Sequence, residues 1–241
     1  MTYTVIGRCQ RTNQIGIGVA TYSLACGSFT QGAQNAFGVV MTQANVRKGN
    51  APLAANLLSQ GLSGKSVLGA LIEDDDHEAL RQIGVMTRSG DSAVHTGALV
   101  QGWAGEKTGP DYLVFGNVLA GEHVIDAMAR GFGEDVSLPL VERLLRSLEH
   151  GRDAGGQGYN IPKLPERSAC LVVMDKKNYA DWDLRVDLHR TAVEELRRIY
   201  EVFANYQPYY NDRDDDPSIC LSQVAWEKKN LTDQQLEEFL K

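Results

Sequence analysis

The second residue of the chain carries the groups best suited to covalent chemistry. Thr2 directly follows Met1, and methionine aminopeptidases remove an initiator methionine when the next residue is small. Thr2 would then hold both a hydroxyl and a free α-amine, which together form a nucleophile and base pair. An α-amine titrates at about 7.7 to 8.0, so much of it can accept the hydroxyl proton near neutral pH. Many chains begin Met-Thr, so an ordinary processed terminus is the alternative interpretation.

The other patterns that could indicate chemistry are incomplete. The run Gly61-Leu62-Ser63-Gly64-Lys65-Ser66 is similar to the end of a phosphate-binding loop, but Ser59 stands where that loop needs a glycine. Gly16-Ile17-Gly18 lacks the third glycine of a dinucleotide-binding turn. The five histidines are widely separated and no Gly-x-Ser-x-Gly motif occurs. We therefore expect neither a metal nor a cofactor. A thiol mechanism at Cys9 or Cys26 is disfavoured, because neither has a recognisable histidine partner.

Composition and charge exclude several classes of protein. The chain has 241 residues, 43% of them apolar and 23% charged, which fits one large domain or two small ones. Its 24 glycines favour a fold with many turns and close backbone contacts. The net charge of -7 and the scattered lysines and arginines argue against nucleic acid as a partner. Without a membrane-length apolar run, a secretory signal or paired cysteines, the expected location is the cytoplasm.

The elements that must hold Thr2 follow from the hydrophobic periodicity. Helices are expected in pairs between groups of strands, with Asn50 capping the first and Pro52 in its first turn. The expected strands span 3–6, 15–20, 37–43, 83–86, 92–95, 112–116, 169–174 and 184–188. The expected helices span 50–58, 63–73, 122–131, 138–150 and 192–203. This order favours the α+β class, with antiparallel sheets and segregated helix layers.

The end of the chain differs in composition from the rest. Residues 205–241 contain Tyr209-Tyr210-Asn211, an acidic run at 214–216 and an amphipathic C-terminal helix pattern. We expect a domain over 1–204 and an extension over 205–241 that packs on the domain or on a partner. A partly ordered tail is the equally weighted alternative.

Seven short stretches, in one order over about residues 1–200, resemble a known family. They are Met1 to Arg8, Ile15 to Ala20, Thr42 to Asn45, Leu80 to Val85, His95 to Gly97, Gly116 to Gly121, and Leu184 to Asp187. The resemblance is to domain-of-unknown-function family 1028, assigned to the N-terminal-nucleophile hydrolase superfamily. It implies a four-layer αββα sandwich of two antiparallel sheets between helix layers. It also implies amide-bond hydrolysis without a metal or cofactor.

The resemblance suggests roles position by position. Thr2 matches the family's first residue and is the expected nucleophile and, through its amine, the base. Ser23 would support the amine or line the pocket, unless it is a turn serine. Gln43 and Asn45 follow a strand and would donate to an oxyanion, with backbone capping as the alternative. Arg8 would bind a substrate carboxylate or face solvent.

Four further positions complete the expected site. His95 and Thr96 end a strand and would face the pocket. The alternative for His95 is a structural histidine that is hydrogen-bonded in the core or at a sheet edge. Asn117 would bind substrate or an oxyanion, or else adopt a left-handed turn. Asp187 is a further candidate, and a structural pair with Arg185 is its alternative.

One segment departs from the family pattern. Relatives carry a basic Gly-Asp-Arg-Arg-Gly type of segment before the late strand, whereas residues 155–163 here are longer and lack the arginine pair. This change implies another specificity or a lost activity. The leading hypothesis is a cytoplasmic amidohydrolase that cleaves a small amide or ureido-type substrate through a Thr2 acyl-enzyme. The alternative is a non-catalytic binding or scaffold protein with the same sandwich. Apolar stripes on the paired helices favour a homo-oligomer, as a dimer or larger.

Overall fold

Two antiparallel sheets form the frame of the chain, in a computed structural model that describes residues 1–30, 34–158, 160, 164–175 and 179–238. The six-stranded sheet has the order β10-β9-β2-β1-β8-β7 and the four-stranded sheet the order β3-β4-β5-β6. The strands of the first are β1 (Thr2–Cys9), β2 (Gln14–Thr21), β7 (Trp103–Gly109), β8 (Tyr112–Leu119), β9 (Ser168–Met174) and β10 (Ala180–Val186). Those of the second are β3 (Gln34–Asn35), β4 (Gly38–Ala44), β5 (Arg81–Thr87) and β6 (Ser92–Thr96).

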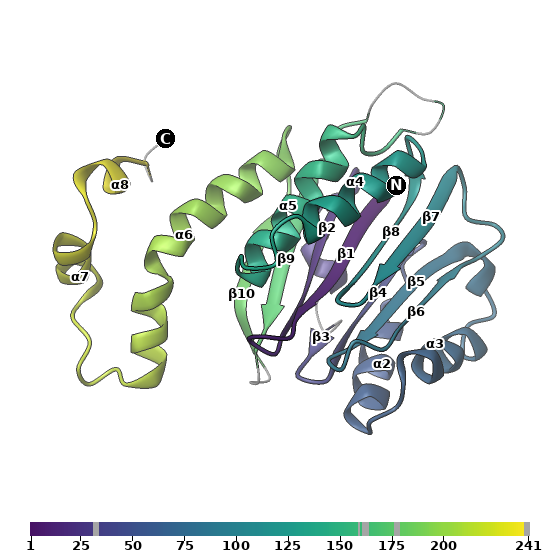
Figure 1. The fold of residues 1–241 in the computed structure, drawn as a ribbon, viewed down its shortest axis with the longest axis horizontal. Helices are drawn as coiled ribbons and strands as arrows, with labels where there is room; N and C mark the ends of the chain where they lie inside the picture. Colours follow the sequence, from purple (N-terminus) through teal and green to yellow (C-terminus); the bar gives the residue numbers. More distant parts are fainter. Residues whose placement is uncertain (31–33, 159, 161–163, 176–178, 239–241) are drawn as a thin grey trace. The chain divides into compact units, whose positions relative to one another are not determined.

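Helices pack against each sheet (Figure 1). Helices α4 (Glu122–Gly133) and α5 (Leu140–Asp153) contact the six-stranded sheet, and α2 (Asn50–Ser59) and α3 (Gly64–Glu73) contact the four-stranded one. Two short turns complete this part, α1 (Gly27–Thr30) and η1 (Glu78–Leu80). Among the residues that the structure describes, no helix has both the length and the apolar character needed to span a membrane.

Period-two alternation along the strands builds the core between the sheets. Ile6 of β1 and Phe115 of β8 belong to the same buried cluster as Val39 and Met41 of β4. The other face of the four-stranded sheet forms a second cluster with α2 and α3. At the Thr2 end of the first cluster, buried polar residues replace the apolar ones, and this change locates the candidate site. They are Thr2, Thr4, Thr21, Gln43, Gln82 and Asn117.

The α+β class and most expected elements are confirmed, with two informative differences. Strand β7 was missed because it is an edge strand whose residues 106–108 are exposed, so it lacks a buried period-two pattern. The expected cap at Asn50 is wrong, since the N-cap position is Gly49 and makes no side-chain hydrogen bond. Asn50 instead donates from Nδ2 to Thr42 Oγ1 at 3.0 Å, tying the helix to β4.

The chain divides into two units, Met1–Glu194 and Glu195–Lys241. Helix α6 (Ala192–Asp215) runs through residue 204, where the composition had suggested a boundary. In the second unit, the expected C-terminal helix is two short helices, α7 (Gln223–Asn230) and α8 (Asp233–Glu238). Tyr206 and Tyr209 pack on Trp226, with ring centroids 5.8 and 5.2 Å apart. This aromatic group is the local core of the second unit.

Candidate active site

Thr2 lies at the start of β1, between two strands that both contribute polar side chains. It is 8% exposed and lies opposite Thr21 of β2 and Asn117 of β8. Its Oγ1 is 3.0 Å from Thr21 Oγ1, which in turn donates to the carbonyl oxygen of Met1 at 2.6 Å. Because a hydroxyl has one proton and the Met1 carbonyl can only accept, Thr2 is the donor in the Thr2–Thr21 pair. The backbone N–H of Ser23 also donates to Thr21 Oγ1, at 3.2 Å.

The amino group of Met1 is partly buried, and this burial changes its pKa. Desolvation lowers the pKa of the Met1 ammonium below its ordinary value. No charged neighbour contributes to that change. This lowered pKa belongs to Met1, and the adjoining residue Thr2 is itself buried.

A network of neutral side chains crosses from this point to the other sheet, and we call it the inter-sheet network: Thr4, Gln43, Gln82, Thr96 and Asn117. Gln82, which is fully buried, is its centre. Its Oε1 accepts from Gln43 Nε2 at 2.8 Å and from Asn117 Nδ2 at 3.2 Å. Its Nε2 donates to Thr96 Oγ1 and to the Gly116 carbonyl, both at 3.0 Å. Thr4 Oγ1 donates to Gln43 Oε1 at 2.6 Å, so the network joins β1, β4, β5, β6 and β8.

The backbone around the network is unusual at three positions. Ala25 (φ 55°), Ala44 (φ 68°) and Val118 (φ 54°) are non-glycine residues in the left-handed region. Ala25 lies in the connection that follows β2, Ala44 is the last residue of β4, and Val118 is near the end of β8. This conformation is a true outlier for a β-branched residue such as Val118. The left-handed turn considered for Asn117 is therefore at the next residue. Strained backbone of this kind gathers at functional sites, where surrounding contacts hold it in place.

Gly116 is required by a close backbone approach to Thr2. A Cβ atom at position 116 would lie 2.9 Å from the Thr2 carbonyl oxygen and 2.6 Å from Leu119 Cδ1. The first distance involves backbone that cannot move without shifting β1. Glycine at this position therefore allows β8 to hold Asn117 directly beside Thr2.

The structure brings five of the nine residues expected from the sequence to one place. Thr2, Gln43, Thr96 and Asn117 lie on the facing sides of the two sheets, and exposed Ser23 borders them through Thr21. The amide of Gln43 is engaged at both ends, so its side chain braces the network. Thr96 also donates to Glu106 Oε2 at 3.3 Å, which carries the network to the exposed edge strand β7.

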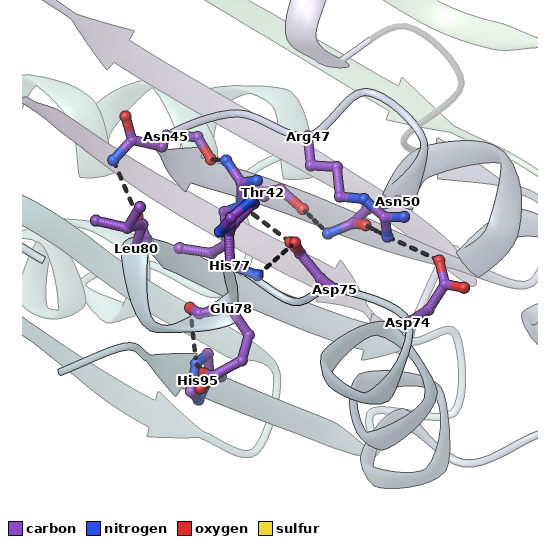
Figure 2. Close-up of polar contacts among 11 residues, drawn as sticks. Thr42, Asn45, Arg47, Asn50, Asp74, Asp75, His77, Glu78, Leu80 and His95 are labelled. Atoms are coloured by element: carbon purple, nitrogen blue, oxygen red, sulfur yellow. Dashed lines mark hydrogen bonds and ion pairs between the residues drawn. The ribbon is translucent and has the colours of Figure 1, made fainter. Parts of the chain in front are cut away.

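Asn45 and His95 lie elsewhere, in the polar group of Figure 2. His95 is opposite Ile83 in register and so faces the helices, where its Nε2 is 2.6 Å from Glu78 Oε2. Exposed Asn45 donates from Nδ2 to the Leu80 carbonyl at 3.2 Å. These two residues brace the connection that leads into β5.

Arg8 and Asp187 are also separated from Thr2. Arg8 is six residues further along β1, about 20 Å away at the usual rise per residue, and its Nε donates to Asp111 Oδ1 at 2.9 Å. Asp187 is exposed, and its carbonyl accepts from the Ala25 N–H at 2.9 Å. The bidentate partner of Arg185 is Asp183, with both contacts at 2.6 Å.

Thr4, Thr21 and Gln82 complete the site and had no role in the sequence analysis. Thr4 and Gln82 lie inside the stretches that carry the family resemblance. The available signal was alternation. Residues two apart in a strand share a face, so each of these polar residues lies on the face that carries the buried apolar residues of its strand. A buried polar residue on such a face needs partners, and here the partners are each other.

Part of the segment that departs from the family pattern borders the site. Gln157 is fully buried, and its Oε1 accepts from the Tyr22 backbone N–H at 2.9 Å. Residue 157 also bridges to Leu119 at the end of β8 and to Leu164. Residues 159 and 161–163 of that segment lie outside the described residues.

Comparison with known proteins shows the family of the chain. The model of DUF1028, a family of unknown function, matches residues 2–196. The chain belongs to the DUF1028 family. Its match begins at Thr2 and ends within two residues of the first structural unit.

Solved structures extend this finding to the fold. The crystal structure of protein SPO2555 from Silicibacter pomeroyi, also a DUF1028 protein, superposes with a TM-score of 0.74 at 24% identity, covering 83% of this chain and 88% of that one. Anbu, an ancestral β-subunit from Yersinia bercovieri, gives a TM-score of 0.38 at 12% identity, covering 84% and 96%. No curated protein matches the chain. The likeness to the DUF1028 structure shows a shared fold.

Proposed function

We propose that this DUF1028 protein is an amidohydrolase that uses Thr2, freed by removal of Met1, to cleave a C–N bond in a small amide or ureido-type substrate. The observation that carries the proposal is the position of the Thr2 hydroxyl. It is held 3.0 Å from Thr21 Oγ1, at the one end of the inter-sheet core where buried amides and hydroxyls replace apolar side chains. Thr2 directly follows Met1 in the sequence.

The proposed reaction needs the hydroxyl, the amine and water. The neutral amine takes the proton from Thr2 Oγ1 as this oxygen attacks the substrate carbonyl. The C–N bond then breaks, the amine passes the proton to the leaving nitrogen, and an ester remains on Thr2. Water, deprotonated by the same amine, hydrolyses the ester and restores the hydroxyl. Burial supports the amine's role as base, because Thr2 is buried and burial already lowers the pKa of the neighbouring Met1 ammonium.

The layer order and the variant segment support the same proposal. We infer a four-layer αββα arrangement from the helix pairs that pack on each sheet and the apolar core between the sheets. Gln157 anchors part of the 155–163 segment beside Tyr22, next to Thr21. Its position supports a role for this segment in the choice of substrate.

An electrophile that reacts with N-terminal threonine tests the proposal without knowledge of the substrate. Intact mass is measured before and after incubation with a β-lactone, whose carbonyl Thr2 Oγ1 would attack with opening of the ring. We expect loss of about 131 Da for Met1 and one adduct at Thr2. Thr2→Ala, and a variant with lysine inserted before Thr2, should form none. Thr12→Ala changes an exposed threonine and should react like the native protein.

The non-catalytic alternative makes the opposite prediction. A binding or scaffold protein with this fold would form no adduct, whether Met1 is retained or removed as in an ordinary processed chain. The decisive sample is a chain that begins with Thr2, released by a protease from a longer fusion. If the native chain keeps Met1 and Thr2 of the released chain does not react, the proposed function is refuted.

A further inference from the structure

Asn117, directly opposite Thr2, has a buried oxygen that lacks a hydrogen bond. The residue is 1% exposed and its Nδ2 donates to Gln82 Oε1. No group in the described parts of the chain donates to Asn117 Oδ1. Buried polar atoms in native proteins almost always have partners, so such an atom calls for a donor supplied in the working state.

A chain of amides fixes the direction of this oxygen. The Gly116 carbonyl can only accept, so the nitrogen of the Gln82 amide must face it. The Gln82 oxygen then faces Asn117, which must present its own nitrogen in return. Rotating the Asn117 amide would bring two oxygens together. Its Oδ1 is therefore held away from Gln82, on the face that Asn117 shares with Thr2.

Removal of Met1 would create the missing donors. The nitrogen of Thr2 is now a peptide amide with one N–H, and it would become an ammonium with three or a neutral amine with two. It would lie across from Asn117 in the antiparallel register, where facing side chains are about 4.5 to 5.5 Å apart at Cβ.

We propose that Asn117 Oδ1 accepts a hydrogen bond from the freed α-amine of Thr2, and that Gln82 is the positioning residue that keeps Asn117 in this orientation. The inference rests on the proposed function only in requiring Thr2 as the first residue. With one N–H directed to Asn117, the lone pair of the amine is left to face the hydroxyl of Thr2. After proton transfer the same contact stabilises the ammonium, and Asn117 stays neutral throughout.

Charged groups around this position lie on the neighbouring strands and connections. Glu106 of β7 is reached through Thr96, and the backbone N–H of Arg167 donates to the Thr21 carbonyl at 2.8 Å. Glu166 influences Tyr3, whose ring packs toward α5 on the other face of β1. Asn117 and Thr21 are the neutral side chains opposite Thr2 in register, and Asn117 Oδ1 is the acceptor among them that has no hydrogen bond within the described residues.

Titration of the amine tests this inference. Protein labelled with ¹³C-threonine is prepared with Thr2 first, by processing or by release from a fusion, and the pKa of the amine is measured by NMR. Asn117→Leu removes the acceptor and should lower the pKa by about 0.5 to 1 pH unit. Asn117→Asp keeps an acceptor and adds a negative charge, so it should raise the pKa. Gln82→Met frees the Asn117 amide and should shift the pKa in the direction of Asn117→Leu.

Gln43→Met is the matched control. This variant removes the hydrogen bond that Gln43 Nε2 donates to Gln82 Oε1 and leaves the bond between Gln82 and Asn117 in place. The pKa of the amine should therefore stay within about 0.2 pH unit of the native value. If Asn117→Leu does not fold, Asn117→Asp is the deciding variant. An amine pKa in Asn117→Asp that is no higher than in the native protein would contradict the proposal. An unchanged pKa in all Asn117 and Gln82 variants would overturn it. Because the titration needs no substrate, a responsive amine in an inactive protein would refute the proposed function alone.

Discussion

Strands β5 and β6 carry polar residues on both faces, and the two faces differ in charge. Arg81 points toward the helices and forms an ion pair with Asp75 at 2.9 Å. Its neighbour Gln82 points toward the other sheet and makes only neutral hydrogen bonds, to Gln43, Thr96, Asn117 and the Gly116 carbonyl. Figure 2 shows most of the polar group on the helix side, which we call the helix-face cluster: Thr42, Asn45, Arg47, Asn50, Asp74, Asp75, Glu78 and His95, together with Arg81, which pairs with Asp75.

The difference in charge between the two faces follows from how far each face is buried. Part of the helix-face cluster lies near water, where the side chains of Arg47 and Asp74 remain 30% and 55% exposed. Its buried carboxylate, Asp75, is paired with Arg81. The inter-sheet network is buried, and amides and hydroxyls can be buried without the cost of desolvating charges. A neutral network also leaves the protonation of a nearby amine under the control of burial and hydrogen bonding. The two faces therefore differ in kind: one holds ion pairs between charged side chains, and the other holds the neutral network beside Thr2 on which the proposed chemistry depends.

The largest expected effect separates the two faces by activity. Thr2→Ala removes the proposed nucleophile and should reduce turnover of an identified substrate by about 10³-fold or more. His95→Ala removes a contact to Glu78 on the helix side, and turnover should fall by less than about threefold. The measurement is kcat/KM in both variants. A large loss for His95→Ala, or full activity of Thr2→Ala, would break the division between the faces.

Unfolding free energy gives the next largest difference. Gln82→Leu leaves several buried partners without hydrogen bonds, among them the Gly116 carbonyl, and should destabilise by about 3 to 5 kcal/mol. Asp74→Ala breaks a partly exposed ion pair with Arg47 and should cost less than about 1 kcal/mol. Urea denaturation measures both. Equal losses would show that burial does not distinguish the two polar groups.

Acid sensitivity should be confined to the helix-face cluster. Burial alone would raise the pKa of Asp75, but hydrogen bonds from Arg81 and from the His77 N–H hold that pKa below its ordinary value of 3.8. A lowered folded-state pKa contributes stability that is present above the unfolded value and is lost as pH falls through the folded one. The stability difference between the native protein and Asp75→Asn should therefore be constant above about pH 5 and shrink below pH 4.

The Gln82→Leu variant supplies the contrast, because the inter-sheet network contains no ionisable side chain. Its destabilisation should be nearly the same at pH 4 and pH 7. A strong pH dependence in this range would contradict the neutral description of the network.

Alternation in the sequence was sufficient to predict most strands and helices, because their apolar residues follow the period of each element. Alternation did not select the site residues: Thr2 was proposed because it follows Met1, and Gln43, Thr96 and Asn117 were proposed from the family resemblance. It could not tell which face of a strand each residue occupies when neighbours are both polar, as with His95 and Thr96. It could not reveal Gln82 as a centre either, since its role depends on three strands that meet only after folding. Edge strand β7, with exposed charges, gave no periodic signal.

The smallest expected effect concerns the backbone that shapes the neutral network. Val118 holds a left-handed conformation that costs a β-branched residue about 1 to 3 kcal/mol. Glycine adopts this conformation freely, but it also gains freedom in the unfolded chain and loses the half-buried side chain. Because these terms oppose one another, Val118→Gly should change the unfolding free energy by less than about 1 kcal/mol. Val114→Gly, at a buried position of the same strand without positive φ, should cost clearly more. Thermal unfolding of both variants checks this order, and equal losses would mean that the left-handed conformation of Val118 carries no appreciable strain.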